Sequence, residues 1–393
     1  MKVKIESFGY IGAIGEEDTW NCIDQNLPPN WQSSIVHSTN KVVAPITIPC
    51  NSIDNRAFRR MDKQIIFELV AGEICAGKYD FNGIDKKRVG IFTGSLFAQL
   101  GFGMTQIRSL IESKEKNEIS MYTGISFYYG AASGEVSLLL KSQGENAVIC
   151  SGACSGTDCI IAGASNIHRG INDFVFAISG ENLEESIINF MLPNTDDKNS
   201  MFIPNKYFYS GGAMAVLLAN DKFSTSQLEI VASVSGNSSK SLFCIQEIDF
   251  KDKLKSLICA CVNKAGIKIE EIDIVIPGLN NTGKSDLCEL EVLQELLVYK
   301  KGIVYNPIPL LGDMLSASGI LKVYVASCCL KEKVLPSNNI GFYEEKYISK
   351  YKSLFNWERR KLFQMQYALI IQKDIIGGRI NVILIKNNEN GNI

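Results

Sequence analysis

The segment from Gly144 to Asp173 constrains the fold of this chain more than any other. An apolar run, 147–150, leads into a tight turn, Ser-Gly-Ala-Cys-Ser-Gly, and a helix-like segment rich in small residues precedes a second apolar run, 174–178. A strand that ends in a sharp turn and feeds a helix exposes one side chain at the helix N-terminus, where unpaired N–H groups and the helix dipole favour negative charge. A cysteine placed there has a favoured thiolate, which suits it to acyl transfer. The function of the chain therefore depends on which residue occupies the apex of this turn.

Short apolar runs alternate with helical patterns along the whole chain. After residue 227, strand-like runs at 228–236, 272–278, 367–371 and 380–385 alternate with helical patterns at 251–265, 286–300 and 311–330. This alternation predicts an α/β fold with mostly parallel sheets. Because the second part loosely repeats the order of the first, we expect two halves, 1–226 and 227–393, of which the first carries the turn described above.

Charge and hydropathy exclude several classes of function. The 393 residues have a formal net charge of −2, which indicates neither a nucleic-acid partner nor an anionic membrane surface. No apolar run approaches the roughly 18 residues that a membrane span needs. The first ten residues, MKVKIESFGY, lack the continuous apolar core of a signal peptide. We therefore expect a cytoplasmic protein.

The cysteines and histidines indicate neither a metal site nor a cofactor. The 12 cysteines contain no CxxC spacing, and in a chain without an export signal they are most simply small buried hydrophobic residues. His37 and His168 are the two histidines, and neither lies near a pair of cysteines. His168 is predicted to lie at a helix C-terminus. We therefore expect no cofactor.

Seven short motifs resemble, in the same order, those of the β-ketoacyl synthases of the thiolase fold. They are Arg60-Met61-Asp62, Gly134-Glu135, Gly144, Gly170 with Asp173, Asp286 with Glu289, the segment 312–319 (GDMLSASG) and Gly377-Gly378. Each motif is weak alone, but their common order indicates the family. The resemblance implies a duplicated, five-layered α-β-α-β-α architecture. It also implies a dimer formed through an edge strand beside the nucleophile strand.

The resemblance further implies which chemistry to look for. The usual reaction of the family is a decarboxylative Claisen condensation, in which a cysteine accepts an acyl chain from the phosphopantetheine of an acyl carrier protein. Two histidines stabilise the enolate and thioester oxygens. The nucleophile must be a good leaving group as a thiolate, and the histidines must donate to oxygens that become negative in the transition state.

Motif spacing assigns the nucleophile position to Ala153. In the family, the glycine that opens the strand lies nine residues before the cysteine, and the glycine that closes the helix lies seventeen after it. Counting forward from Gly144 and back from Gly170 gives Ala153 both times. Cys154 is its neighbour, and at a sharp turn a shift of one residue points the side chain elsewhere. A one-residue deletion with a compensating insertion would restore Cys154, so this alternative stays open.

Both histidine positions are also changed. Gly278 stands eight residues before Asp286, where the family has its first histidine, and a shorter loop would place Asn280 there. An amide cannot act as an acid or base. Asp313 replaces the second histidine, and an ionised carboxylate would repel the developing oxyanion. Ile308 stands where the family has a lysine before this motif. The Cys-His-His triad is therefore predicted to be lost, and the ordinary condensation with it.

These residues favour a non-catalytic subunit of the chain-length-factor type. Such subunits resemble ketosynthases throughout, lack their triad and form a heterodimer with an active β-ketoacyl synthase in type II polyketide or aryl-polyene pathways. They supply half of the acyl tunnel and cap it. We expect the tunnel or the interface to include Phe127, Tyr128, Tyr129, Glu135 and Ile376. A simpler interpretation is that the aromatic residues fill a core or a strand pair.

Two other functions stay open. An atypical acyl-transferring or thioester-handling enzyme would use Cys154 as nucleophile, with Asn280 or Asp313 orienting a proton acceptor. A homodimeric scaffold for acyl carrier protein would use the basic segment 357–361 (WERRK). A solvated surface helix explains that segment more simply.

Overall fold

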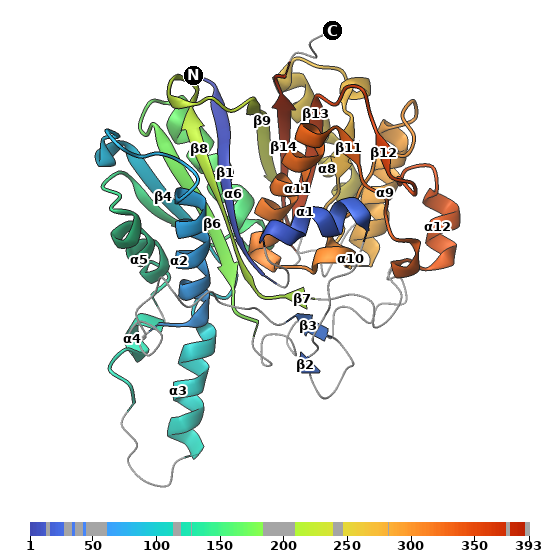
Figure 1. Cartoon of the computed structure of the whole chain (residues 1–393). Coiled ribbons are helices and arrows are strands. Elements are labelled where there is room, and N and C mark those ends of the chain that lie inside the picture. Colours follow the sequence, from blue (N-terminus) through green and yellow to red (C-terminus); the bar gives the residue numbers. More distant parts are fainter. Residues whose placement is uncertain are drawn as a thin grey trace.

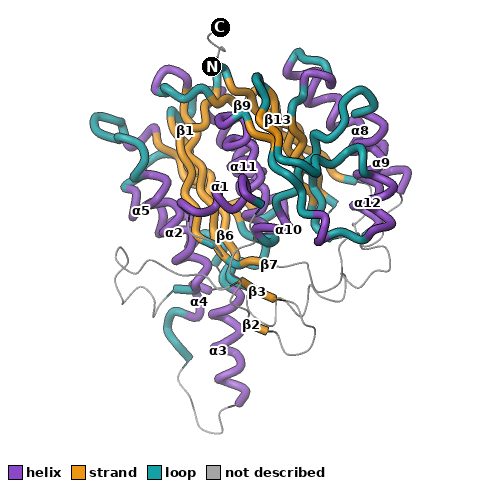
Figure 2. Tube along the Cα trace, turned by 45° about the vertical axis from the view of Figure 1, so that its right-hand side comes forward, coloured by secondary structure: helices purple, strands orange, loops and turns teal. Residues whose placement is uncertain are grey.

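The centre of the molecule is one nine-stranded sheet with helices on both of its faces (Figures 1 and 2). Figure 1 shows the computed structural model, whose described residues are 1–12, 16–26, 34–35, 42–44, 61–112, 119–126, 128–183, 209–238, 247–281, 283–374 and 378–389. Within these residues, no helix combines the length and the hydrophobicity that crossing a membrane requires.

The sheet consists of two sets of strands joined at one corner. The first set runs in the order β5 (Asn146–Ile149), β4 (Val89–Gly94), β6 (Phe174–Glu181), β8 (Gly212–Asn220) and β1 (Val3–Ile11). The second set continues as β9 (Leu228–Asn237), β14 (Arg379–Asn387), β13 (Tyr367–Lys373) and β10 (Ile274–Ile276). Only two residue pairs, Val3 with Ile230 and Lys4 with Glu229, join β1 to β9. We place the boundary between the two halves at residues 226 and 227, directly before β9, as a proposal.

The prediction of mostly parallel sheets is wrong. Three neighbouring pairs are parallel (β4–β5, β4–β6 and β10–β13), whereas the other five pairs of the nine-stranded sheet are antiparallel. The connection from β13 to β14 is too short for the crossover that parallel strands need. A fully buried strand such as β6 or β8 is apolar on both faces. Its sequence therefore reports burial and says nothing about the direction of its neighbours.

Helices divide the molecule into five layers, as the resemblance implies. One outer layer contains α2 (Lys63–Ala76) and α5 (Ala131–Leu140), which pack on the first set of strands. The middle layer contains α6 (Ser155–His168) and α11 (Ser318–Glu332), which lie against each other between the two sets. The other outer layer contains α8 (Glu247–Ala265) and α9 (Lys284–Leu296). The α/β class and the layer order are thus confirmed.

Two predicted helices have different ends in the structure. The helix predicted at 286–300 already ends at Leu296. The helix predicted at 311–330 begins only at Ser318, because Gly312 and Leu315 adopt positive φ angles of 84° and 51° that interrupt a right-handed helix. A short helix, α10 (Ile308–Leu311), and a 3₁₀ turn precede α11 instead.

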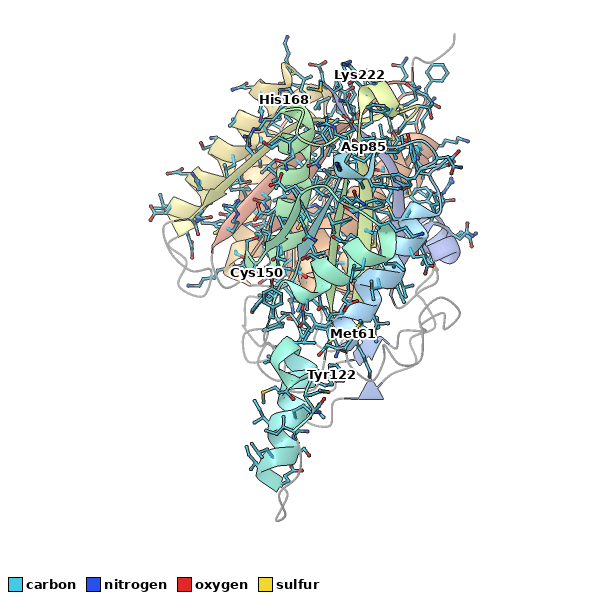
Figure 3. The ribbon with its side chains drawn as sticks, turned by 90° about the vertical axis from the view of Figure 1, so that its left-hand side faces the viewer. Met61, Asp85, Tyr122, Cys150, His168 and Lys222 are labelled. Carbon is cyan, nitrogen blue, oxygen red and sulfur yellow. The ribbon has the colours of Figure 1, made fainter. Side chains whose placement is uncertain are left out.

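The remaining elements lie around this core. They are α1 (Glu16–Gln25), α3 (Leu100–Glu112), α4 (Thr123–Ser126), α12 (Glu345–Tyr351), a small sheet of β2 (Ser34–Ile35), β3 (Val42–Ala44) and β7 (Tyr209–Ser210), and a pair of β11 (Val334–Leu335) with β12 (Arg360–Lys361). Helix α3 projects from the body as an arm in all three views (Figures 1 to 3).

Candidate functional site

The predicted strand, turn and helix between Gly144 and Asp173 are present. Strand β5 ends at Ile149, a 3₁₀ turn covers Gly152–Cys154, and α6 starts at Ser155. The hydroxyl of Ser155 pins the turn, since it accepts the Ser151 N–H at 3.0 Å and donates to the Gly152 carbonyl at 2.6 Å. Ala153 and Cys154 lie buried at the N-terminal end of α6. Local hydrogen bonds thus give this segment the geometry of a nucleophile turn.

The backbone of Ala153 is hydrogen-bonded to side chains of the second half of the molecule. Its amide N–H donates to Asp374 Oδ1 at 2.8 Å, and its carbonyl accepts from Gln372 Nε2 at 3.0 Å. Both partners come from the end of β13. The methyl side chain offers no nucleophile.

Cys154 has the surroundings of a structural cysteine. Its side chain is fully buried, and its Sγ lies 3.5 Å from the carbonyl oxygens of Gln372 and Arg379. Burial raises the pKa of the Cys154 thiol well above its ordinary value, and the carboxylates of Asp374 and Asp158 raise it further. A neutral, enclosed thiol is a poor nucleophile.

We expect alkylation to separate Cys154 from the exposed Cys150. Cys150 is accessible although burial of part of its side chain raises its thiol pKa to about 11. In the folded chain, iodoacetamide should modify Cys154 more than about 100-fold more slowly than Cys150, because reaching it requires local unfolding. Peptide mass spectrometry after timed alkylation measures both rates. Similar rates in the folded protein would contradict the structural role of Cys154.

Gly278 leaves no room for a histidine. Its N–H donates to Glu289 Oε1 at 2.5 Å. A Cβ atom at this position would lie 2.9 Å from Glu289 Oε2 and 3.2 Å from the Ile371 side chain. The alternative position, Asn280, is 4% exposed, and its N–H lies 3.4 Å from Asp286 Oδ1. Neither residue is hydrogen-bonded to the thiol of Cys154, whose partners in the described chain are backbone carbonyls.

The side chain of Asp313 is hydrogen-bonded within the loop that leads into α11. Its Oδ1 accepts from the Leu315 N–H at 2.8 Å and from Ser318 Oγ at 2.6 Å, and the residue is 3% exposed. Its carbonyl also accepts from the Ser210 N–H, which ties the small sheet to this loop. A carboxylate engaged in this way supports the backbone and cannot donate to an oxyanion.

A buried lysine that the sequence analysis missed pairs with both carboxylates of the acidic motif. Lys373 Nζ lies 2.6 Å from Asp286 Oδ1 and 3.0 Å from Glu289 Oε2, and all three side chains are at most 1% exposed. Burial by itself lowers the pKa of the Lys373 ammonium, but the attraction of Asp286 and Glu289 more than offsets this, so the pKa lies above its usual value. Lys373 is the last residue of β13, and Ile308 stands where the resemblance implies a lysine. A lysine directly after the apolar run YALIIQ was the available signal.

Two further carboxylates are buried in the first half. Glu181, at the end of β6, accepts from the hydroxyls of Ser95 and Ser316 at 3.1 and 2.6 Å and from the amides of Leu96 and Phe97. Burial raises the pKa of Glu181 to about 7, although these hydrogen bonds oppose the shift. Burial and the charge of Glu181 raise the pKa of Glu68 well above its ordinary value. Glu181 joins loops of both halves, and both carboxyl groups are closed to solvent.

The residues expected at the tunnel or interface fall into two groups. Phe127 and Ile376 lie outside the described residues. Tyr128 and Tyr129 are 66% and 45% exposed, so the interpretation that they fill a core is wrong for these two. Glu135 on α5 is half-buried.

The basic segment at 357–361 is partly neutralised. Arg359 donates from Nε to Asp24 Oδ1 at 2.6 Å, and Arg360 donates to the Gly302 carbonyl. The segment forms β12 and adjoining loop rather than a helix, so the prediction of a surface helix is wrong. Elsewhere, no group of three or more His, Cys, Asp or Glu in the described ranges is placed to hold a metal ion.

Comparisons with known proteins agree with this geometry. Residues 37–191 match the family model of the β-ketoacyl synthase N-terminal domain. The 3-oxoacyl-[acyl-carrier-protein] synthase 1 of Buchnera aphidicola is 24% identical over 314 residues, which cover 74% of this chain and 75% of that protein. A β-ketoacyl synthase from Burkholderia phymatum superposes with a TM-score of 0.83 at 16% identity over 98% of this chain and 99% of its own. A ketosynthase in complex with its chain length factor from Xenorhabdus doucetiae superposes with a TM-score of 0.82 at 14% identity, over 98% of each chain.

Proposed function

Because the chain is a β-ketoacyl synthase-family protein, we propose that it is a non-catalytic subunit, a chain length factor, that pairs with an active β-ketoacyl synthase and shapes the acyl tunnel. Its place would be in type II polyketide or aryl-polyene biosynthesis, where the partner receives acyl groups from an acyl carrier protein. The observation that carries the proposal is the filling of all three catalytic positions by Ala153, Gly278 and Asp313.

The chemistry of these positions opposes condensation. Ala153 has no group that can bind and release an acyl chain. The amide of Gly278 faces Glu289, and the carboxylate of Asp313 accepts from Leu315 and Ser318. Removing one oxyanion donor typically costs a factor of about 10² to 10³ in rate. Losing two donors together with the nucleophile leaves no route for the ordinary reaction.

The surface beside the turn suits a partner of the same fold. Strand β5 is the outermost strand of its end of the sheet, and next to it the side chains of Tyr128, Tyr129 and Leu138 are exposed. Figure 3 faces this side, with Cys150 at the lower end of the body and His168 at the upper end. The arm adds exposed apolar side chains, namely Ile107, Leu110 and Ile111 of α3 and Ile119, Met121 and Ile125 after it. An open strand edge flanked by apolar residues favours pairing with another chain.

Co-expression tests the proposal. The chain should co-purify at 1:1 stoichiometry with an active ketosynthase co-expressed from the same genome, and size-exclusion chromatography with light scattering should give a heterodimer. By itself, the chain should take no acyl group from an acylated carrier protein. A stable homodimer that ignores the ketosynthase would overturn the proposal and favour the scaffold function.

A proline in β5 should prevent this pairing. The Ile91 N–H donates to the Glu145 carbonyl, so by strand alternation the Val148 N–H points to the open edge. Val148→Pro removes that donor, and an edge strand tolerates proline. We expect loss of the heterodimer in the co-purification with an unchanged melting temperature of the isolated chain. Val148→Thr, which keeps both the N–H and the branched shape, should pair normally.

The second candidate is an atypical acyl-transferring or thioester-handling enzyme that uses Cys154. Its support is the name of the Buchnera relative, which is a synthase, and the identity of 24%. The burial of Cys154 weighs against it. A stable acyl adduct on Cys154 would favour this candidate, whereas unchanged product output from Cys154→Ala would remove it.

A further inference from the structure

Asp374 belongs to the second half of the molecule, and its side chain contacts the turn at 152–154 in the first half. It lies directly after β13, and its side chain and backbone are 2% exposed. Its backbone N–H donates to the Arg379 carbonyl at 2.8 Å, which fixes the residue at the start of β14. Its Oδ1 accepts from the Ala153 N–H at 2.8 Å, although the two residues are 221 positions apart.

The turn is shaped to receive this carboxylate. Gly152 has a φ of +69°, and a Cβ atom there would lie 1.9 Å from Asp374 Oδ1. Gly152 is therefore needed both for its backbone conformation and for the close approach of the carboxylate. No side chain fits at 152 while Asp374 keeps its place.

Asp374 occupies the backbone N–H of Ala153, which directly precedes the N-cap of α6. Backbone N–H groups at the start of a helix stabilise anions, and such donors polarise a thioester carbonyl when they point at its oxygen. Here the Ala153 N–H already donates to the carboxylate of Asp374, a residue of the same chain. A second anion at the same place would meet electrostatic repulsion.

Other charged groups near the turn are paired with their own partners. Asp158 on α6 accepts from Arg379 Nε and a second guanidinium nitrogen at 2.8 and 2.7 Å. Lys322 on α11 donates to Gln372 Oε1 at 2.8 Å. The charge of Asp374 thus adds to that of Asp158 in raising the pKa of the thiol of Cys154, the neighbour of Ala153.

We propose that Asp374 is a built-in blocking group that holds the anion position of the turn, so that a nucleophile restored at residue 153 would stay inactive as long as Asp374 is present. This inference rests on the proposed non-catalytic function and deepens it. On this proposal, the turn differs from a reactive one at two residues, Ala153 and Asp374. Asp374 acts as a positioning residue on the backbone at 153.

The test compares two variants of the full chain, both carrying Cys150→Ser to remove the exposed thiol. One has Ala153→Cys alone, and the other has Ala153→Cys with Asp374→Asn. Iodoacetamide alkylation of residue 153 is followed by mass spectrometry from pH 6 to 10, and the buried Cys154 and Cys159 in the same tryptic peptide, 142–169, serve as internal controls. The charge control combines Ala153→Cys with Asp221→Asn, which removes a carboxylate at an exposed site instead of that of Asp374.

The sulfur of a cysteine at 153 is three bonds from the amide nitrogen that Asp374 binds, so the carboxylate acts on that thiol at close range. We expect Asp374→Asn to speed alkylation at pH 7 at least about tenfold and to lower the apparent thiol pKa by about one unit or more, because a carboxylate nearby raises a thiol pKa by that amount. Asp221→Asn should change neither. Equal rates and equal pKa values with and without Asp374 would overturn the inference.

Two features of the design make the outcome interpretable. Asp374→Ser keeps an oxygen acceptor without the charge, and it provides a second comparison if the asparagine variant fails to fold. Alkylation of the isolated chain also does not depend on a ketosynthase. Failure to form the heterodimer would therefore overturn the proposed partner and leave the result for Asp374 unaffected.

Discussion

Replacing Lys373 by methionine is expected to destabilise the chain by about 3–5 kcal/mol, because removing one partner of a buried ion pair leaves uncompensated charge in the interior. Lys373 faces two carboxylates, Asp286 and Glu289, and all three side chains are closed to solvent. The same carboxylates accept from the backbone of Gly278 and Asn280, so the loss should also loosen the loop after β10. Urea unfolding followed by circular dichroism measures the effect.

Two comparisons show whether charge is the cause. The triple variant Lys373→Met, Asp286→Asn, Glu289→Gln has no net charge at this place and should recover a large part of the lost stability. Lys255→Met breaks an ion pair with Glu295 on the surface, where both partners are more than a third exposed, and should leave the midpoint of urea unfolding almost unchanged. A cost of less than about 1 kcal/mol for Lys373→Met would contradict the importance of the buried pair.

The stability of the chain is expected to fall as the pH rises through the range of Glu181. The folded-state pKa of this carboxyl is about 7, above its ordinary value of 4.5, because burial disfavours the charged form. Between these two values the folded chain holds a proton that the unfolded chain has lost, so the contribution is full below about pH 4.5 and lost above about pH 7. One pKa unit corresponds to about 1.4 kcal/mol, so the whole range amounts to about 3 kcal/mol.

Glu181→Gln isolates this contribution. Between pH 5.5 and 8, urea unfolding should show that the natural chain loses about 2 kcal/mol more than the variant, because glutamine does not titrate. Glu68 is buried next to Glu181, whose charge helps to raise the pKa of Glu68, so the difference between the two proteins reports on this pair of carboxyl groups. The exposed Glu295→Gln should leave the slope with pH unchanged. Identical slopes in the natural chain and Glu181→Gln would mean that Glu181 is ionised throughout.

Local features of the chain were predictable from the sequence. The strand before the turn, helix α6 and the next strand follow from apolar runs and small residues that are neighbours along the chain. The assignment of Ala153, Gly278 and Asp313 depends on counting between glycines and acidic residues. The hydrogen bonds that Asp313 accepts from Leu315 and Ser318 are local as well, since both residues follow it within five positions.

Contacts between distant segments were not predictable. Lys373 meets Asp286 across 87 positions and Asp374 meets Ala153 across 221, and no periodicity or spacing links such pairs. The directions of the strands were also missed, because a strand buried on both faces looks the same whichever way its neighbours run. Burial of Cys154 likewise depends on β13 and β14, which lie more than 200 positions further along the chain.

The sequence by itself determined the class of fold and the turn at the start of α6, and it predicted Ala153, Gly278 and Asp313 at the three catalytic positions, since each of these is a property of residue type and local spacing. Only the tertiary structure decided which distant residues contact these positions. Folding brings the end of β13 and the residue after it against the acidic motif and the turn at 152–154, where Lys373 pairs with Asp286 and Glu289 and Asp374 accepts from the amide of Ala153. The reason is physical: buried charges and backbone donors need partners, and the three-dimensional packing alone selects which distant residues supply them.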